Sequence, residues 1–268
     1  MNHNEHPFWA LGYVLIFLAI QVMAQTAAFA ATYIINGGQP EPPTAIVTIV
    51  AMALFSLATI ALFTRAGWAP VSRSYVVSRP WVVVAWSVVA ALGALLPSLY
   101  VQELLPQWPE ALQRYADQTE AEAMRLMSER GGYALLCLLA PVAEELVFRG
   151  AVLRTLLGWR PQRRWAMIAL SALLFALAHL NPAQLLHPFA AGLLLGWMYE
   201  RTRSVVPGII FHWANNTAAY LLWHAYPAAD ITLADIFGSS AHATMGVLFS
   251  LLILLPAIYQ LHLNMRRA

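Results

Sequence analysis

The chain has 268 residues, of which 60% are hydrophobic and only 10% are charged, and its mean hydropathy is +0.61. Soluble domains carry about 25% charged residues, so this composition excludes a soluble globular protein and indicates an integral membrane protein. The net charge of +2 is too small to indicate a nucleic-acid partner. The one cysteine, Cys137, excludes an internal disulfide and a multi-cysteine metal site.

The first apolar segment runs from residue 9 to residue 35 and ends at an Asn-Gly-Gly sequence. The residues before it carry no Lys or Arg, and the apolar run is longer than the roughly 7–15 residues of a signal-peptide core. We therefore expect a transmembrane helix that is retained in the mature protein, rather than a cleaved secretory signal.

Further apolar segments follow in chain order. They cover residues 44–64, 81–100, 133–153, 165–180, 185–200, 205–226 and 244–261. A helix needs about 20 apolar residues to cross the hydrocarbon core, and only the fifth and sixth segments are short for that task. The sequence predicts an all-α integral membrane protein of about eight transmembrane helices with an intramembrane polar cavity, in which residues 1–268 form a single membrane domain.

The basic residues are unevenly distributed between the two sides of this layout. All fifteen are arginines, and all but Arg114, Arg125 and Arg130 fall near the end of the fourth segment (Arg149), in the loops after the second, fourth and sixth segments, or in the C-terminal tail. Positive residues concentrate on the cytoplasmic side of a membrane, so we predict that both termini are cytoplasmic. The exclusive use of arginine favours a GC-rich bacterial source, and we expect a multi-pass protein of the bacterial cytoplasmic (inner) membrane.

Residues 101–130, between the third and fourth segments, are polar and predicted to be extracytoplasmic. Their acidic residues outnumber their arginines, and Leu112, Tyr115, Met124 and Met127 recur at loosely helical spacing. This pattern leaves two interpretations open, a short surface helix and a solvated loop.

Glu144 and Glu145 lie inside the fourth segment, where a charged side chain costs about 2.5–3.5 kcal/mol on insertion scales. Adjacent helix residues point about 100° apart, so the two carboxylates cannot face one partner. Arg149 follows Glu145 by four residues, a spacing that favours an ion pair. We therefore assign Glu145 to Arg149 and expect Glu144 to face the interior of the bundle. The alternative is that all three residues only hold helices together.

Pro141 lies one turn before the glutamate pair. It has no N–H, so the carbonyl of Cys137 loses its helical donor and the helix is expected to kink. Irregular backbone at membrane depth is tolerated where it lines a cavity. Cys137 lies on roughly the same face as Glu144, and we interpret it as a small packing residue rather than a catalytic thiol.

Two further polar pairs have a spacing of four residues, Phe175 with His179 and His212 with Asn216. Histidine supplies a proton that switches near neutral pH, and asparagine supplies a neutral donor and an acceptor. His212 and Asn216 are therefore suited to hold an oxyanion. Asn215 competes for the second role, but its offset of three places it less directly under His212.

The sixth segment contains two features that we do not assign to chemistry. His187 stands at its start and is interpreted as an interfacial residue. Gly192 and Gly196 form a GxxxG pattern, which allows close contact between helices in a bilayer.

The three motifs, in this order, resemble the CPBP family of CAAX proteases and bacteriocin-processing enzymes. The residues that carry the resemblance are Glu144-Glu145-x-x-x-Arg149, Phe175-x-x-x-His179 and His212-x-x-x-Asn216. The connecting sequence also has the family's usual order, with Phe189, Gly192, Gly196, Tyr199, Thr202, Ser204 and Pro207. The resemblance covers residues 130–225, which we expect to form the catalytic core.

The resemblance implies an eight-helix intramembrane endopeptidase of the glutamate type. Its substrate would be a membrane-tethered peptide or protein, or a lipid-modified one, and its surroundings the lipid bilayer. In that family the first glutamate and the histidine of the second motif activate a water, and the histidine and asparagine of the third motif stabilise the tetrahedral intermediate. The residues that match these catalytic positions are Glu144, His179, His212 and Asn216. The supporting positions are matched by Glu145, Arg149 and Phe175.

No cofactor is required by this mechanism, because water activation and oxyanion stabilisation can both be supplied without a metal. Zinc is the alternative, since Glu144, His179 and His212 make a set of two histidines and one glutamate with an open position for water. The His-Glu-x-x-His signature of zinc proteases is absent from the sequence. We favour the metal-free mechanism.

Two other functions stay open from the sequence. Intramembrane carboxylates and histidines also mark proton-coupled transporters, although the chain has no repeated halves with matching broken helices. The second is a catalytically dispensable immunity or scaffold protein of the same fold. The presence of every motif residue favours the peptidase over both.

The motifs differ in their predicted depth in the membrane. Glu144 falls slightly past the middle of the fourth segment, whereas His179 lies near the outer end of the fifth. For the two side chains to share a water, the fifth helix must begin deeper or tilt. We expect the cavity to open to the cytoplasmic side.

Overall fold

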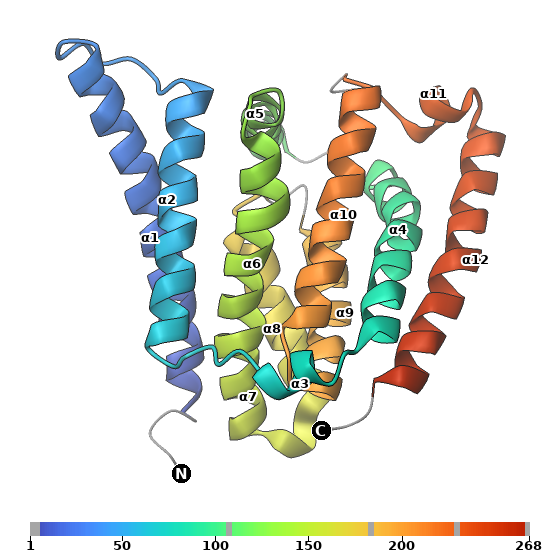
Figure 1. Ribbon diagram of the computed structural model, residues 1–268. Helices are drawn as coiled ribbons and strands as arrows, with labels where there is room; N and C mark the ends of the chain where they lie inside the picture. The colour runs from blue at the N-terminus through green and yellow to red at the C-terminus, as the bar shows by residue number, and fades with distance from the viewer. Residues whose placement is uncertain (1–5, 106–108, 182–184, 228–230, 266–268) are drawn as a thin grey trace.

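The computed structural model describes residues 6–105, 109–181, 185–227 and 231–265. These residues fold into helices, and none of the described segments contains a strand. Figure 1 shows helices standing side by side and alternating in direction, with α1 (Pro7–Ile35) beginning and α12 (Ser240–Asn264) ending at the same end of the bundle. The prediction of an all-α protein is confirmed.

Among the described residues, four helices are long and apolar enough to cross a membrane, namely α1, α2 (Ala45–Arg65), α4 (Trp81–Glu103) and α12. Their most apolar windows have a mean hydropathy of 2.0 to 2.5, and only 22% to 33% of each window is buried inside the protein. Large apolar surfaces of this kind mark contact with a membrane or a partner. The chain is a multi-pass membrane protein, and these helices match four of the predicted segments closely.

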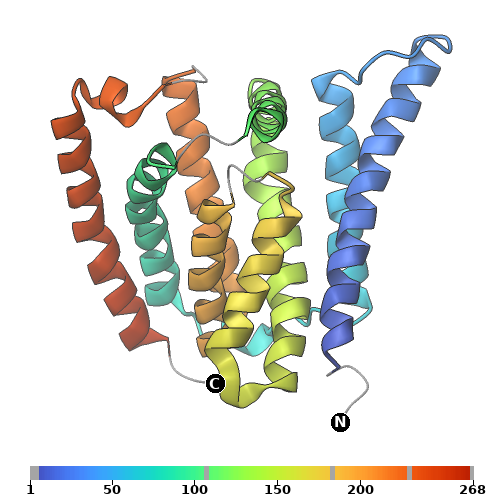
Figure 2. The ribbon, with the colours of Figure 1, turned by 180° about the vertical axis from the view of Figure 1, so that it is seen from behind.

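The other predicted segments form a more polar group between these helices. The fourth segment consists of η2 (Ala134–Leu139), α6 (Ala140–Glu145), η3 (Leu146–Leu153) and α7 (Arg154–Trp159), and η4 (Pro161–Arg163) follows it. The fifth to seventh segments are α8 (Arg164–Ala178), α9 (Leu186–Thr202) and α10 (Val206–Ala225). Figures 1 and 2 show α1 and α2 together on one flank of this group, and α4 and α12 on the other.

The helix that carries the glutamate pair is wound in π-helical turns on both sides of α6. In the first run, η2, the N–H of Ala140 binds the carbonyl of Leu135, five residues earlier. Pro141 follows immediately, at the start of α6. The irregularity expected from Pro141 is therefore present, in the form of widened turns rather than the loss of a single α-helical bond. Such π-helical turns are rare and occur frequently at functional sites.

Small residues set the distances between helices in the bundle. Gly192 and Gly196 of α9 face α8, where an added Cβ would lie 2.9 Å from the Cβ of Ala172 and 2.8 Å from a methyl carbon of Ile168, respectively. In a bilayer, close approach of this kind replaces the hydrophobic driving force between helices. The interpretation of the GxxxG pattern as a packing element is confirmed.

The flanking helices are attached to the bundle in different ways. The ring of Phe148 in η3 packs edge-on against Phe17 of α1, with 5.5 Å between the ring centroids. At the other flank, α4 and α12 touch at Gly93, where an added Cβ would lie 2.7 Å from the backbone nitrogen of Leu254. The hydroxyl of Ser250 donates to the Gly93 carbonyl at 3.1 Å. Aromatic packing thus holds one flank and close backbone contact the other.

Three shorter helices connect the long ones. The polar segment forms α5 (Glu110–Met127), so the surface-helix interpretation of residues 101–130 holds for this stretch and the loop interpretation does not. Its Arg125 donates to Pro43 O at 3.1 Å and ties α5 to the start of α2. The sequence did not predict α3 (Arg73–Val77) or α11 (Leu233–Phe237), which have five residues each. Helices this short cover little more than one turn and show no hydrophobic periodicity.

Candidate active site

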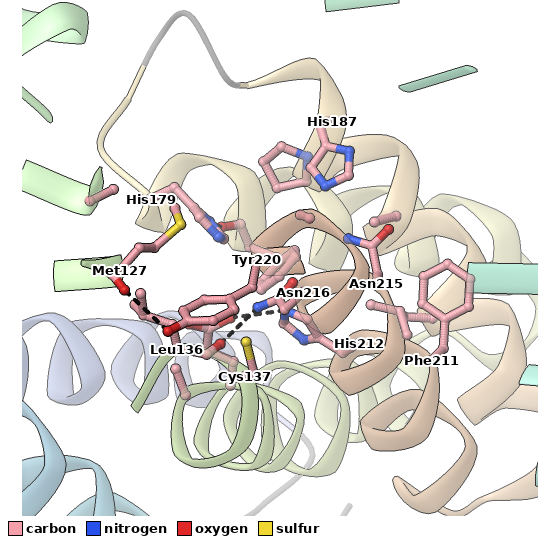
Figure 3. Close-up of a pocket in the computed structure, with 18 residues that line it drawn as sticks. Met127, Leu136, Cys137, His179, His187, Phe211, His212, Asn215, Asn216 and Tyr220 are labelled. Carbon is pink, nitrogen blue, oxygen red and sulfur yellow. Dashed lines mark hydrogen bonds and ion pairs between the residues drawn. The ribbon is translucent and has the colours of Figure 1, made fainter. Parts of the chain in front are cut away.

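A cavity of about 320 Å³ opens among α5, α6, α8, α9 and α10 (Figure 3). Its apolar wall includes Phe175, Phe211 and Leu195. Its polar lining consists of Glu144, His179, His187, His212, Asn215, Asn216, Cys137 and Tyr220. The four residues to which the sequence assigned catalytic roles therefore line one common space.

Glu145 turns away from this space and is fully buried. Its Oε1 accepts a hydrogen bond of 2.7 Å from Nη1 of Arg149, which is also fully buried. The guanidinium lies 4.3 Å from the centroid of the Phe175 ring. The ion pair predicted from the four-residue spacing is present. Loss of either partner would leave an uncompensated charge in the interior, so this pair is a strong constraint on the fold.

Glu144, in contrast, faces the cavity and its side chain keeps 18% of its surface exposed. Its Oε2 lies 3.7 Å from Nε2 of His212. The two adjacent carboxylates thus have the separate environments that the 100° rotation between them predicts. Glu144 is the one that can meet a water or a substrate.

His212 stands between the two carboxylates, in the second turn of α10. Its Nδ1 lies 3.3 Å from Glu145 Oε1, and its Nε2 faces Glu144 and the cavity. An ionised carboxylate can only accept, so this bond requires a hydrogen on Nδ1. Glu145 therefore fixes the orientation of the His212 ring and leaves Nε2 as the nitrogen available for chemistry.

His179 has its ring fixed in a similar way. It caps the C-terminal end of α8, and its Nδ1 lies 2.9 Å from the carbonyl oxygen of Phe175. A carbonyl only accepts, so Nδ1 carries a hydrogen, and in the neutral ring the free lone pair is on Nε2. The ring also packs edge-on against the Phe175 ring, with 4.8 Å between centroids. His179 is thus oriented as a hydrogen-bond acceptor or base toward the cavity that it lines.

Glu144 and His179 line the same cavity because α8 is short. In Figure 2, α8 rises from the end of the bundle where α12 finishes and stops part-way up, whereas α1 and α10 continue further. The end of α8 therefore lies inside the bundle, at the level of the cavity. His179 lies at the end of α8, as the sequence predicted, and α8 itself ends part-way along the bundle.

The neighbouring asparagines point in different directions. Asn216 donates from Nδ2 to the carbonyl oxygen of Leu136 in η2 at 3.0 Å. Asn215 is buried on the side of His187, and its Oδ1 has no hydrogen-bond partner (Figure 3). An amide group carries two N–H donors, so Asn216 keeps one for a ligand. The choice of Asn216 over Asn215 as the partner of His212 stays a prediction.

The residues named for a metal are Glu144, His179 and His212. Within residues 6–105, 109–181, 185–227 and 231–265, no group of three His, Cys, Asp or Glu side chains is arranged so that it could hold a metal ion. Zinc would therefore need these side chains to move together. The observation bears on the arrangement of the ligands alone.

One part of the chain is similar to a known protein family. Residues 130–218 match the model of the type II CAAX prenyl endopeptidase Rce1-like family. The chain contains an Rce1-like domain. No curated protein and no solved structure matches the chain.

The Rce1-like domain holds every candidate residue from Glu144 to Asn216 and begins just before η2. Part of the cavity wall comes from outside it. Met127 of α5 lines the cavity and accepts a hydrogen bond of 3.1 Å at its carbonyl from the hydroxyl of Tyr220, two residues beyond the match. The domain thus supplies the polar groups of the cavity other than Tyr220, and α5 helps to close the cavity around them.

His187 is the residue of the Rce1-like domain that the sequence analysis missed. It lines the cavity, and its Nδ1 is hydrogen-bonded to the hydroxyl of Ser98 in α4. The sequence analysis gave His187 no place in the cavity. One signal was available, because the short connection from α8 to α9 places His187 only eight residues after His179.

Proposed function

We propose that this chain is an intramembrane endopeptidase that hydrolyses a peptide bond of a membrane-tethered or lipid-modified substrate. The observation that carries the proposal is the convergence of Glu144, His179, His212 and Asn216 on one cavity inside a Rce1-like domain of a multi-pass membrane protein. A base, a second proton acceptor and two oxyanion partners are the groups that metal-free hydrolysis needs.

Glu144 and His179 activate the water. The Glu144 carboxylate accepts a proton from it, while Nε2 of the neutral His179 ring, whose Nδ1–H donates to Phe175 O, accepts a hydrogen bond from the same water. The resulting hydroxide attacks the carbonyl carbon of the scissile bond, and Glu144 returns the proton to the leaving amine. General acid–base catalysis of this kind contributes roughly 10²- to 10⁴-fold.

His212 and Asn216 stabilise the tetrahedral intermediate. In its protonated form His212 donates Nδ1–H to Glu145 and has Nε2–H for the oxyanion. Asn216 contributes the N–H that Leu136 does not use. The negative charge on Glu145 is in turn balanced by Arg149, which gives these two residues and the stacked Phe175 a supporting role.

The membrane arrangement that fits this function has eight transmembrane helices. To α1, α2, α4 and α12 we add the helix from Ala134 to Trp159, α8, α9 and α10, all of which lie between the flanking helices. We place both termini in the cytoplasm, in a bacterial inner membrane, because of the arginine distribution. Residues 1–268 then form one membrane domain around an intramembrane cavity.

The test compares membrane peptidomes of cells that produce the wild type, Glu144→Gln or Glu110→Gln. Glu110 lies on the exposed surface of α5, so its variant is a matched control for loss of a carboxylate. A peptide that accumulates uncut only with Glu144→Gln identifies the substrate. Identical peptidomes for all three proteins would contradict the proposal and favour a scaffold, whereas proton-coupled flux in proteoliposomes that is lost in Glu144→Gln would favour a transporter.

A further inference from the structure

A second cavity adjoins the candidate active site. It has a volume of about 400 Å³, lies among α4, α9, α10 and α12, and is lined almost entirely by apolar side chains. Ala94, Leu194 and Leu254 contribute to this lining and are absent from the lining of the first cavity. The volume lies within the roughly 300–1,000 Å³ that is usual for small-ligand pockets.

The two cavities share a wall. Its members are His187, Ala191, Phe211 and Asn215. The hydrogen bond between His187 and Ser98 ties this wall to α4. A ligand that enters one cavity therefore passes directly beside the other.

Asn215 is the unusual member of this wall. Its residue surface is only 5% exposed, and its side-chain oxygen has no hydrogen-bond partner. Buried polar atoms in native proteins are almost always paired, because an unpaired one loses its water without compensation. The side-chain nitrogen of the neighbouring Asn216, in contrast, donates to the carbonyl of Leu136. The unpaired oxygen of Asn215 indicates a donor that arrives with a ligand.

We propose that the apolar cavity is a substrate subsite. It receives a large aliphatic or aromatic side chain of the peptide beside the scissile bond, while Asn215 Oδ1 accepts a hydrogen bond from the backbone N–H of that segment. The inference deepens the proposed function and rests on it. It makes the size of one substrate side chain a determinant of specificity.

A peptide fits this pair of features better than a lipid chain does. An acyl or isoprenoid chain would fill the apolar volume but carries no N–H, so the oxygen of Asn215 would stay unpaired at the wall. A peptide segment offers an apolar side chain for the cavity and a backbone donor for the wall at the same time. The shared wall then lies where the segment must pass to reach Glu144 in the first cavity.

The experiment uses the full chain in proteoliposomes and a library of N-terminally acylated peptides with random residues, with cleavage sites read by mass spectrometry. Ala94→Phe fills the apolar cavity and Leu194→Ala enlarges it. Leu193→Ala is the matched control, because Leu193 packs in the other core beside α1 and does not line either cavity. Melting temperatures in detergent check that each variant is folded.

We expect the wild type to prefer a bulky apolar residue at one position beside the cleaved bond. Ala94→Phe shifts that preference toward small residues by about tenfold or more in kcat/KM, and Leu194→Ala shifts it toward larger ones, since one methylene in an apolar pocket is worth roughly 10- to 200-fold. Leu193→Ala keeps the wild-type preference. Asn215→Leu raises KM about 2- to 10-fold with kcat unchanged, as the loss of one hydrogen bond predicts.

Different failures have different meanings. A preference that is unchanged in both Ala94→Phe and Leu194→Ala overturns the subsite and leaves the peptidase standing. If the two cavity variants instead change the preferred length of the acyl anchor and leave the residue preference unchanged, the cavity binds a lipid chain. That result also overturns the side-chain subsite. A drop in kcat without a rise in KM for Asn215→Leu overturns the binding role of Asn215. No cleavage of any peptide by the wild type contradicts the proposed function itself.

Discussion

Asn216 donates a hydrogen bond of 3.0 Å to the backbone carbonyl of Leu136, at the point where the helix of the glutamate pair is wound in π-helical turns. In that winding Ala140 N–H binds Leu135 O, so the next donor in the series would be the nitrogen of Pro141. Proline has no N–H. The Leu136 carbonyl is thereby left without its backbone donor, and Asn216 supplies the replacement.

The first prediction concerns this relationship. Pro141→Ala gives the Leu136 carbonyl a backbone donor that competes with Asn216, which we expect to release the side chain and lower kcat about tenfold. Asn216→Ala should cost roughly 10²- to 10³-fold in kcat, as does loss of an oxyanion donor elsewhere. The decisive measurement is the double variant. If Pro141→Ala lowers kcat equally in the presence and absence of Asn216, the two residues act independently and the coupling is refuted.

The second prediction concerns stability. Glu145→Gln leaves Arg149 charged and unpaired in the interior, and we expect a loss of about 3–5 kcal/mol in the free energy of unfolding. The double variant Glu145→Gln with Arg149→Met should recover most of the lost stability. It should not recover the activity, because His212 no longer has its carboxylate partner. Unfolding in mixed micelles measures the stability. A single variant as stable as the wild type would argue against the buried pair as a constraint on the fold.

The third prediction uses a glycine on α10. A Cβ at Gly208 would lie 2.6 Å from Oε2 of Glu145, the carboxylate oxygen that has no hydrogen-bond partner. Gly208→Ala should displace Glu145 and cost about 1–3 kcal/mol of stability, together with a loss of activity. Gly12→Ala in α1 is the control, since its Cβ would meet only Trp9 at 4.0 Å. Equal melting temperatures for the two variants would show that Glu145 has room to move.

The fourth prediction concerns metal. Purified enzyme should keep its activity after prolonged chelation, because Glu144 and His179 are assigned to metal-free water activation and His212 to stabilisation of the tetrahedral intermediate. Activity after dialysis against a strong chelator, with and without added zinc, is the measurement. Loss of activity that only zinc restores would contradict the metal-free mechanism and favour the zinc mechanism, with Glu144, His179 and His212 as ligands.

The helices were largely predictable from the sequence, since a membrane span has a fixed length and its apolar run is easy to recognise. The segment 81–100 begins at the same residue as α4, and the end of 9–35 coincides with that of α1. The π-helical turns before Pro141 were not predictable, because their i to i+5 bonds depend on which neighbouring groups satisfy the freed carbonyls. One such group is the side-chain amide of Asn216, which lies far away in the sequence on α10 and donates to the Leu136 carbonyl.

The candidate site was predictable in its membership and only partly in its geometry. Spacing alone separated Glu144 from Glu145, because a helix fixes the angle between adjacent side chains. The depth of His179 depended on where α8 ends inside the bundle, and the role of His187 in the cavity wall depended on Ser98 in α4. Both are tertiary relationships that no local pattern contains.

The ring of Phe175 has a consequence for how this chain tolerates change. It touches the guanidinium of Arg149 and packs edge-on against both His179 and His212, with centroid separations of 4.8 Å and 5.9 Å to the two imidazoles. One apolar side chain is therefore the common spacer of three polar motifs that are far apart in sequence. A smaller residue at this position would remove a contact that Arg149, His179 and His212 share, so a single substitution would loosen all three side chains at once.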